Sequence, residues 1–313
     1  MLASALILAS ALSVFQDNCP PIVIGTSDNF VFDITWPTGE IGTGSDAAFS
    51  GFGRLSVNGI PYIATECFEL VGNTDGQTVI TPPLQTPDGL IVKRRIYVPM
   101  KPHANYVRYY DRIENTTTTE KTVLVEFGGA IGLPGTDAAV IREKPGWCII
   151  NAPRPNNGPL IGWIYTHGLP LVPTHATTGD NYYSLAYPVH IKPGASVAIV
   201  NFIFQAGSGE PLAGGLSVEA TPVDDLSDSM DGLQNSPDYS NLTSDEKRII
   251  VNFFIDTDVN MDGRVNILDL IVIRNDLNKT PDTAGNPRSD VNHDLRINIL
   301  DLILTRNDLG WPY

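Results

Sequence analysis

The C-terminal quarter of the chain contains one 20-residue sequence twice, and this repeat constrains the fold more than any other feature. Residues 258–277 read DVNMDGRVNILDLIVIRNDL and residues 290–309 read DVNHDLRINILDLILTRNDL, with 15 of 20 positions identical at an offset of 32 residues. Each copy opens with carboxylate and amide side chains at every second position, which is the spacing of a calcium-binding loop. The apolar stretch after each loop predicts helices over 267–276 and 299–308.

The spacing assigns a set of oxygen ligands to each loop. In an EF-hand-type loop, positions 1, 3, 5, 9 and 12 supply side-chain oxygens and position 7 supplies a backbone carbonyl, which suits a hard cation that takes six to eight oxygens. We therefore predict two Ca²⁺ sites. The predicted ligands are Asp258, Asn260, Asp262, the Arg264 carbonyl, Asn266 and Asp269 in the first loop, and Asp290, Asn292, Asp294, the Arg296 carbonyl, Asn298 and Asp301 in the second.

The two loops differ at their sixth position, where the backbone turns sharply. Gly263 occupies this position in the first loop and Leu295 occupies it in the second. A left-handed conformation costs a non-glycine residue about 1 kcal/mol. We therefore expect the second site to bind calcium more weakly.

The paired repeat resembles a type I dockerin domain. A dockerin has two F-hand motifs, each a calcium loop followed by one helix, with Asp at position 12, and Asp269 and Asp301 fit that feature. The resemblance covers residues 258–313 and implies a small all-α, EF-hand-like domain whose partner is a cohesin-like protein module.

The resemblance also implies which residues contact that partner, namely positions 10, 11, 17 and 18 of each repeat. These are Ile267, Leu268, Arg274, Asn275, Ile299, Leu300, Arg306 and Asn307. The best-known cellulosomal dockerins often have Ser or Thr at positions 10 and 11, so the apolar residues here put the familiar cellulosomal partner in doubt. The duplicated face would allow a partner to bind in either of two orientations. The alternative is that the four apolar residues pack against the module's own helices or against the rest of the chain.

The larger N-terminal part has the pattern of β-structure. Short runs of alternating apolar and polar residues are separated by Gly- and Pro-rich turns, without interleaved helices, which favours a large antiparallel β-sandwich over residues 18–221. In 121–127, Val123, Val125 and Phe127 are expected on one face. Residues 89–127 are expected to form a three-stranded meander. The predicted fold class is thus a mainly β domain followed by a small all-α domain.

A change of composition marks the predicted boundary between the two parts. Residues 219–246 contain eight acidic and no basic residues among Ser, Pro, Gly and Asn, which predicts an acidic linker over 222–242. Thr243 and Glu246 then fit the N-cap and N3 positions of a capping box. We expect a short helix from Ser244 to about Phe254 that packs on the repeats, within a dockerin-like domain over 243–313.

The remaining composition limits the compartment and the partners. The net charge of −15 makes nucleic acid an unsuitable partner, and no internal stretch is apolar for long enough to span a membrane. The apolar residues 1–16 predict a signal peptide and hence secretion, the alternative being a first strand or buried arm. Cys19, Cys67 and Cys148 allow at most one intramolecular disulfide and leave one thiol.

No motif identifies an active site. His103, His167 and His175 have no metal-binding spacing, and Trp36, Trp147 and Trp163 fit either a sugar platform or the core. Three hypotheses remain. The first is a secreted modular protein in a polysaccharide-degradation context, whose dockerin-like module attaches it to a partner and whose sandwich serves recognition or scaffolding, with polysaccharide as a possible ligand. The others are a polysaccharide-degrading glycoside hydrolase on the sandwich that is anchored by the dockerin, and a structural surface protein with a calcium-stabilised cap. We therefore name no catalytic residue.

Overall fold

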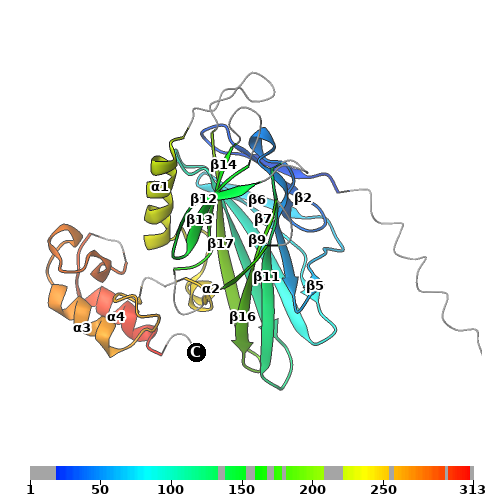
Figure 1. Ribbon diagram of the computed structural model, residues 1–313. Coiled ribbons are helices and arrows are strands. Elements are labelled where there is room, and N and C mark those ends of the chain that lie inside the picture. The colour runs from blue at the N-terminus through cyan, green and yellow to red at the C-terminus, as the bar shows by residue number, and fades with distance from the viewer. Residues whose placement is uncertain are drawn as a thin grey trace, which may run out of the picture.

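A β-sandwich and a small helical unit make up the chain (Figure 1). The structure is a computed structural model that describes residues 19–132, 138–152, 159–167, 173–177, 181–207, 221–253, 257–292 and 295–310, with only the backbone described at 174–177 and 244. The predicted signal peptide over 1–16 and the predicted ligand Asp294 lie outside the described residues.

Two antiparallel sheets form the sandwich, as the alternating runs predicted. The first has the order β1-β2-β3-β4-β11-β16-β15, with β5 paired to β4, and the second β12-β13-β14-β17-β10-β9-β7-β6, with β8 paired to β9. The strands of the first sheet are β1 Ile22–Gly25, β2 Val31–Thr35, β3 Glu40–Ile41, β4 Phe49–Val57, β5 Ile60–Pro61, β11 Lys121–Ile131, β15 Thr174–Thr177 and β16 Tyr182–Ile191. Those of the second are β6 Glu69–Asn73, β7 Gly76–Ile80, β8 Leu84–Gln85, β9 Leu90–Pro99, β10 Tyr106–Asn115, β12 Ala139–Lys144, β13 Trp147–Asn151, β14 Leu160–Ile164 and β17 Ser196–Ala206.

The main core lies between the two sheets, because side chains alternate between the faces of each strand. In β11, Val123, Val125 and Phe127 are buried as predicted, whereas Leu124 is exposed. A short 3₁₀ helix, η1 (Ser45–Ala47), precedes β4.

The tryptophans belong to the interior rather than to a sugar platform. Trp147 and Trp163 are buried, and the Trp163 ring meets Phe52 edge to face at a centroid distance of 5.1 Å. Trp36 is partly buried against the main core. The core alternative of the sequence prediction therefore holds for these residues.

A fully buried ion pair lies in this core, between neighbouring strands of the second sheet. Arg94 on β9 donates from Nε and Nη2 to the two carboxylate oxygens of Asp111 on β10, at 2.7 and 3.0 Å, and neither side chain is exposed. The Arg94 Nη1 also donates to the carbonyls of Gly53 and Thr38, and the guanidinium lies 4.7 Å from the Tyr109 ring centroid. Such a paired, hydrogen-bonded geometry is what a buried charge requires.

The predicted meander over 89–127 is wrong in its third strand. β9 and β10 pair as expected, but β11 pairs with β4 and β16 in the first sheet. The turn between β10 and β11 therefore crosses from one sheet to the other. Strand alternation fixes which side chains face inward but does not fix which sheet a strand joins, so the pattern alone did not reveal this crossing.

The predicted acidic linker is also wrong, because residues 221–253 form a strap over the outer face of the second sheet. Within the strap, α1 (Val223–Asn235) places Val223, Leu226, Met230 and Leu233 on one face at helical spacing. Leu226 and Met230 are buried in a second core cluster with outward-facing residues of the sheet. This face explains why a segment of linker-like composition folds as a helix.

The acidic residues of the strap bind side chains of the second sheet. The pairs are Asp224–Arg142 (2.7 Å), Asp231–Lys144 (2.5 Å), Asp238–Tyr106 (2.6 Å) and Glu246–Arg95 (2.6 Å). The carboxylates of this segment therefore neutralise basic side chains of the sheet that it covers, and one of them accepts a hydrogen bond from a tyrosine hydroxyl.

The helix predicted after Thr243 is shorter than expected and packs elsewhere. The Thr243–Glu246 capping box is present, but α2 covers only Ser244–Arg248. Beyond it, Ile250 pairs with Ala198 in β17, and the Asn252 side chain hydrogen-bonds both backbone groups of Val200. These contacts extend the sandwich to Phe253, so the buried side chains of the strap pack on the sheet. Its contacts with the repeats are polar, from Arg248 to Asp308 and from Arg288 to the Asn235 carbonyl.

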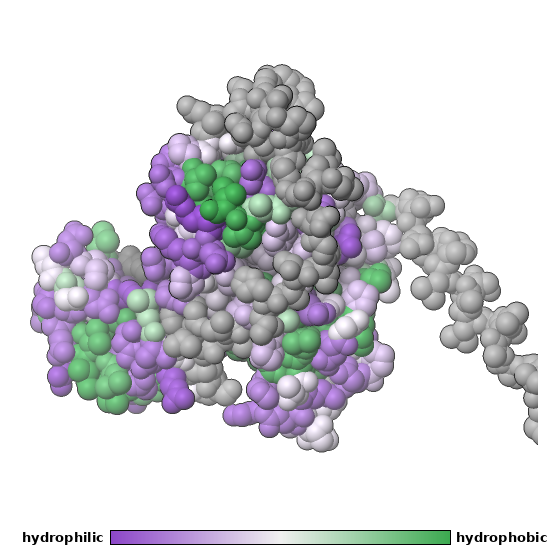
Figure 2. Space-filling view, viewed as in Figure 1, coloured by the Kyte–Doolittle hydropathy of each residue, from purple (hydrophilic) through white to green (hydrophobic). Residues whose placement is uncertain are grey.

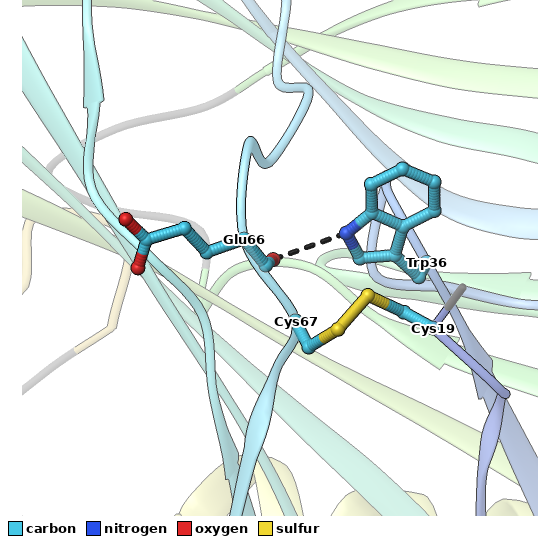
Figure 3. The surroundings of a disulfide bond; sticks show 4 residues. All are labelled: Cys19, Trp36, Glu66 and Cys67. Atoms are coloured by element: carbon cyan, nitrogen blue, oxygen red, sulfur yellow. Dashed lines mark hydrogen bonds between the residues drawn. A yellow bond between two sulfur atoms is a disulfide. The ribbon is translucent and has the colours of Figure 1, made fainter. Parts of the chain in front are cut away.

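One disulfide ties the beginning of the sandwich to the segment before β6 (Figure 3). Cys19 bonds Cys67 across 48 residues, and beside it the Trp36 Nε1 donates to the Glu66 carbonyl at 3.0 Å. Cys148 is a buried free thiol. The structure thus contains the single bridge that three cysteines allow, and it decides which two cysteines form it.

Residues 257–310, called here the calcium module, contain two similar helices, α3 (Ile267–Asp276) and α4 (Ile299–Asn307). Two 3₁₀ turns, η2 (Pro281–Thr283) and η3 (Pro287–Ser289), connect the repeats. Its core of buried residues is small and consists of Val259, Ile273, Val291 and Ile297.

Candidate functional site

The first predicted calcium loop is closed by hydrogen bonds to its own carboxylates. The Asp258 carboxylate accepts from the backbone N–H groups of Asp262 and Gly263, and the Asp269 carboxylate accepts from those of Asn260 and Asn266. Asp258 and Asp269 are fully buried. The carboxylates at positions 1 and 12 therefore both point into the loop, which is the arrangement needed for both to coordinate one cation.

The second loop repeats this geometry. The Asp301 carboxylate accepts from the N–H groups of Val291, Asn292 and Asn298, and Asp290 accepts from that of Leu295 at 3.0 Å. Leu295 adopts the left-handed conformation that was expected, with φ +66°, like Gly263 with φ +83°. The sixth position therefore makes the same bond in both loops but carries backbone strain only in the second.

The predicted ligands also begin the helices. Asn266 is the N-cap of α3 and accepts from the Leu268 N–H at 2.8 Å, while Asp269 at N3 returns a bond to the Asn266 N–H. Asn298 and Asp301 cap α4 in the same way. One set of side chains thus determines both the loop and the start of the helix that follows it.

The electrostatics of the first loop fit a bound cation. Burial, followed by repulsion from Asp269 and Asp262, raises the pKa of Asp258 to about 7. Burial also raises the pKa of Asp269. A divalent cation would offset this repulsion, and carboxylate, amide and carbonyl oxygens are the ligands that Ca²⁺ takes.

No group of three or more His, Cys, Asp or Glu side chains in the described ranges is arranged as a metal cluster. The predicted shells do not consist of such groups alone, because they include amide side chains and a carbonyl. The assignment of the twelve ligands therefore stays a prediction that rests on spacing and on the donor types.

An apolar groove of about 380 Å³ separates the exposed faces of α3 and α4. Both helices line it with equivalent residues, 32 positions apart in the sequence. They are Ile267, Leu270, Ile271 and Arg274 from α3, and Ile299, Leu302, Ile303 and Arg306 from α4. Hydrophobic residues gather over these two helices in Figure 2.

The residues predicted to contact a partner lie at or beside this groove. Ile267 and Ile299 are each 62% exposed, and Leu268 and Leu300 are each 51% exposed. The alternative in which these four side chains pack internally is therefore wrong. Arg274, Asn275, Arg306 and Asn307 are also exposed.

Sequence reasoning missed part of the groove. Ile271 and Ile303 are 37% and 42% exposed and were not among the predicted contact residues. Their spacing of four residues from Ile267 and Ile299 would have identified them, since positions i and i+4 share a helix face.

Comparison with protein-family models shows to which domain family the two repeats belong. Residues 256–310 match the family described as Dockerin type I domain. The calcium module is a dockerin domain. Dockerin domains of this type bind calcium and cohesin modules, which agrees with the resemblance drawn from the repeats.

The sandwich has similar solved structures, but the similarity is distant. Heparan sulfate lyase HepC from Pedobacter heparinus, solved as a mutant, matches with a TM-score of 0.40 and 8% identity, over 60% of this chain and 35% of the lyase. A GH36 α-galactosidase AgaA variant from Geobacillus stearothermophilus matches with a TM-score of 0.32 and 9% identity, over 51% of this chain and 30% of the galactosidase. The chain thus covers about a third of these proteins, and scores this low carry no conclusion about activity.

Two further searches gave negative results. The search of curated proteins gave no match. In the part of the chain that the structure describes, no helix has the length and hydrophobicity to cross a membrane.

Proposed function

We propose that this protein attaches to a cohesin-like module through the groove between α3 and α4, and that two bound calcium ions hold the groove in shape. The observation that carries this proposal is the groove itself, which exposes equivalent apolar residues from both repeats on a dockerin domain. Solvent-exposed apolar surface of this kind is costly unless a partner covers it.

The charges that line the groove indicate what kind of partner surface would fit it. Arg274 and Arg306 line the apolar centre, in a chain whose net charge is −15. A partner would therefore present an apolar patch accompanied by acidic groups, because like charges opposite the guanidinium groups would weaken the complex.

Calcium enters this proposal as a structural ion. The six predicted ligands of each loop would hold it, and it would neutralise the buried carboxylates and fix the loop that starts each helix. In this chain, Asn266 with Asp269 and Asn298 with Asp301 orient the first turns of α3 and α4. Removing calcium would thus disorganise the groove without touching any residue that lines it.

We assign the β-sandwich a recognition or scaffolding role in an extracellular, polysaccharide-degrading setting. The dockerin domain supports this setting, and the Cys19–Cys67 disulfide supports an oxidising compartment. A panel of polysaccharides, assayed for binding and for release of reducing sugar, tests the role. Binding without release is expected, and sugar release that a single carboxylate substitution abolishes would replace this role with that of a hydrolase.

A pull-down with immobilised cohesin modules tests the attachment. The full chain is expected to bind in calcium and to be released by a chelator. The double variant I267D/I299D is expected to lose binding, whereas V23D, which alters an equally exposed residue on β1, is expected to retain it. Binding that persists in chelator or in the double variant would refute the groove as the attachment surface.

A further inference from the structure

The end of α3 is bonded to the entrance of the second calcium loop. Asp276 is the last residue of α3, and its carboxylate accepts from the Ser289 hydroxyl at 3.0 Å. Ser289 directly precedes Asp290, the first predicted ligand of the second loop. Both partners of this bond are buried.

The end of α4 makes the equivalent bond to the first loop. Asp308 directly follows α4 and accepts from the Thr257 hydroxyl at 2.9 Å, and Thr257 directly precedes Asp258. The Asp308 carboxylate also accepts from the Arg248 Nε in the strap at 2.6 Å. Thr257 and Ser289, like Asp276 and Asp308, are 32 residues apart, which is the offset of the repeat. The end of each helix is therefore bonded to the start of the loop in the other repeat.

A second pair of crossed bonds lies between the backbones. The N–H of Asn278, just beyond α3, donates to the carbonyl of Ile297 in the second loop at 2.8 Å. The N–H of Gly310, just beyond α4, donates to the carbonyl of Val265 in the first loop at 2.8 Å. Val265 and Ile297 both occupy position 8 of their loops and are buried.

Each loop is therefore fixed at its entrance and at position 8 by residues that end the helix of the other repeat. The start of each helix is capped by the predicted ligands at positions 9 and 12 of the loop that precedes it in the same repeat. A physical chain thus runs from the ligands of one loop, through one helix, to the entrance of the other loop.

We propose that Asp276 with Ser289 and Asp308 with Thr257 are positioning pairs that couple the two calcium loops, so that ordering of either loop increases the calcium affinity of the other. This inference rests on the proposed calcium binding. Coupling of this kind is reciprocal, so each site must strengthen the other by the same factor. A hydrogen bond to a charged group corresponds to about a tenfold change in an equilibrium constant.

Calcium titration of the full chain by calorimetry tests the coupling in a double-mutant cycle. Thr257→Val removes one positioning hydroxyl, and Asp290→Ala disables the second loop. We expect Thr257→Val to weaken calcium binding at the first loop about tenfold when the second loop is intact. The same substitution is expected to have no further effect in the Asp290→Ala background.

Two matched substitutions serve as controls. Thr257→Ser keeps the hydroxyl and is expected to bind like the parent chain. Among the residues that the structure describes, the Thr283 hydroxyl bonds only to Thr280, the N-cap of η2, so Thr283→Val is also expected to bind like the parent chain. Ser289→Ala, tested with and without Asp258→Ala, gives the reciprocal cycle and decides the question if Thr257→Val does not fold.

The outcomes separate this inference from the proposed function. A parent chain that binds no calcium would refute the proposed function. A parent chain that binds two ions, combined with a Thr257→Val effect that is absent or equal in both backgrounds, would refute the coupling alone.

Discussion

In the β-sandwich, the fully buried Asp111 is neutralised by Arg94, a residue of the same core. In the calcium module, Asp258 and Asp269 are buried to the same extent, and among the described residues no Lys or Arg forms an ion pair with either. The sandwich carries its own counter-charge inside a large apolar core, whereas the module buries few apolar side chains. From this comparison we expect the sandwich to be stable without a bound ion and the module to need a cation to complete its fold.

Removing calcium is the strongest way to test this comparison. Two sites at a hundredfold excess of calcium over Kd stabilise the module by about 5 kcal/mol in total. We expect a chelator to unfold residues 257–310 and to leave the sandwich folded, seen as loss of helical circular dichroism and of one calorimetric transition. A calorimetric scan that is identical with and without chelator would contradict the difference between the two parts.

Breaking the buried ion pair between Arg94 and Asp111 should destabilise the β-sandwich. Asp111→Ala leaves Arg94 buried without its partner and is expected to destabilise the sandwich by about 3–5 kcal/mol in urea unfolding. Asp225→Ala, on the exposed face of α1, should change stability by less than about 0.5 kcal/mol. A loss that appears in the calcium-dependent transition instead would show that the two parts do not unfold separately.

The pH dependence of stability tests how much the charge of Asp238 in the strap stabilises the sandwich. Burial opposes ionisation of Asp238, but hydrogen bonds from Ser240 and Tyr106, together with Lys101 at 3.9 Å, lower its pKa from 3.8. The folded state thus favours the carboxylate, so its stabilisation is complete above about pH 4 and is lost as the pH falls further.

Asp238→Asn is therefore expected to destabilise the sandwich by about 1.5–3 kcal/mol at neutral pH. The difference from the parent chain should shrink as the pH falls below 3.8. Melting temperatures of both chains between neutral and acidic pH measure this. An equal difference at all pH values would mean that shape, not charge, holds the strap at this position.

The smallest expected effect concerns the two repeats themselves. Leu295→Gly removes the strain of a left-handed leucine and is expected to strengthen calcium binding at the second loop by about 1 kcal/mol, or roughly fivefold. Gly263→Leu is the reverse exchange and should weaken the first loop by a similar factor. Calorimetric titration of both variants measures the change, and unaltered affinities would show that the sixth position does not make the sites unequal.

Several features were predictable because they depend on neighbours in the sequence. The left-handed Leu295 follows from its place in the loop, and the Thr243–Glu246 capping box follows from a spacing of three residues. The inward faces of strands follow from alternation, as in β11. In each case the deciding interactions lie within one turn or one strand.

Other features depend on which surfaces meet in space. The acidic residues of the strap resemble a linker until the basic outer face of the second sheet is present to bind them. The exposure of Ile267 and Ile299 could not be separated from internal packing without knowing how α3 lies against α4.

The sequence by itself therefore determined the antiparallel β class of the large part and the dockerin identity of the repeats. The first follows from the alternation of apolar and polar residues along each strand, and the second from the spacing of the predicted ligands within each loop. Only the tertiary structure decided that β11 joins the opposite sheet, that the strap completes the sandwich, and that each helix ends on the other repeat's loop. These arrangements join residues far apart in the chain, and their stability comes from burial and charge pairing that exist only once the surfaces have met.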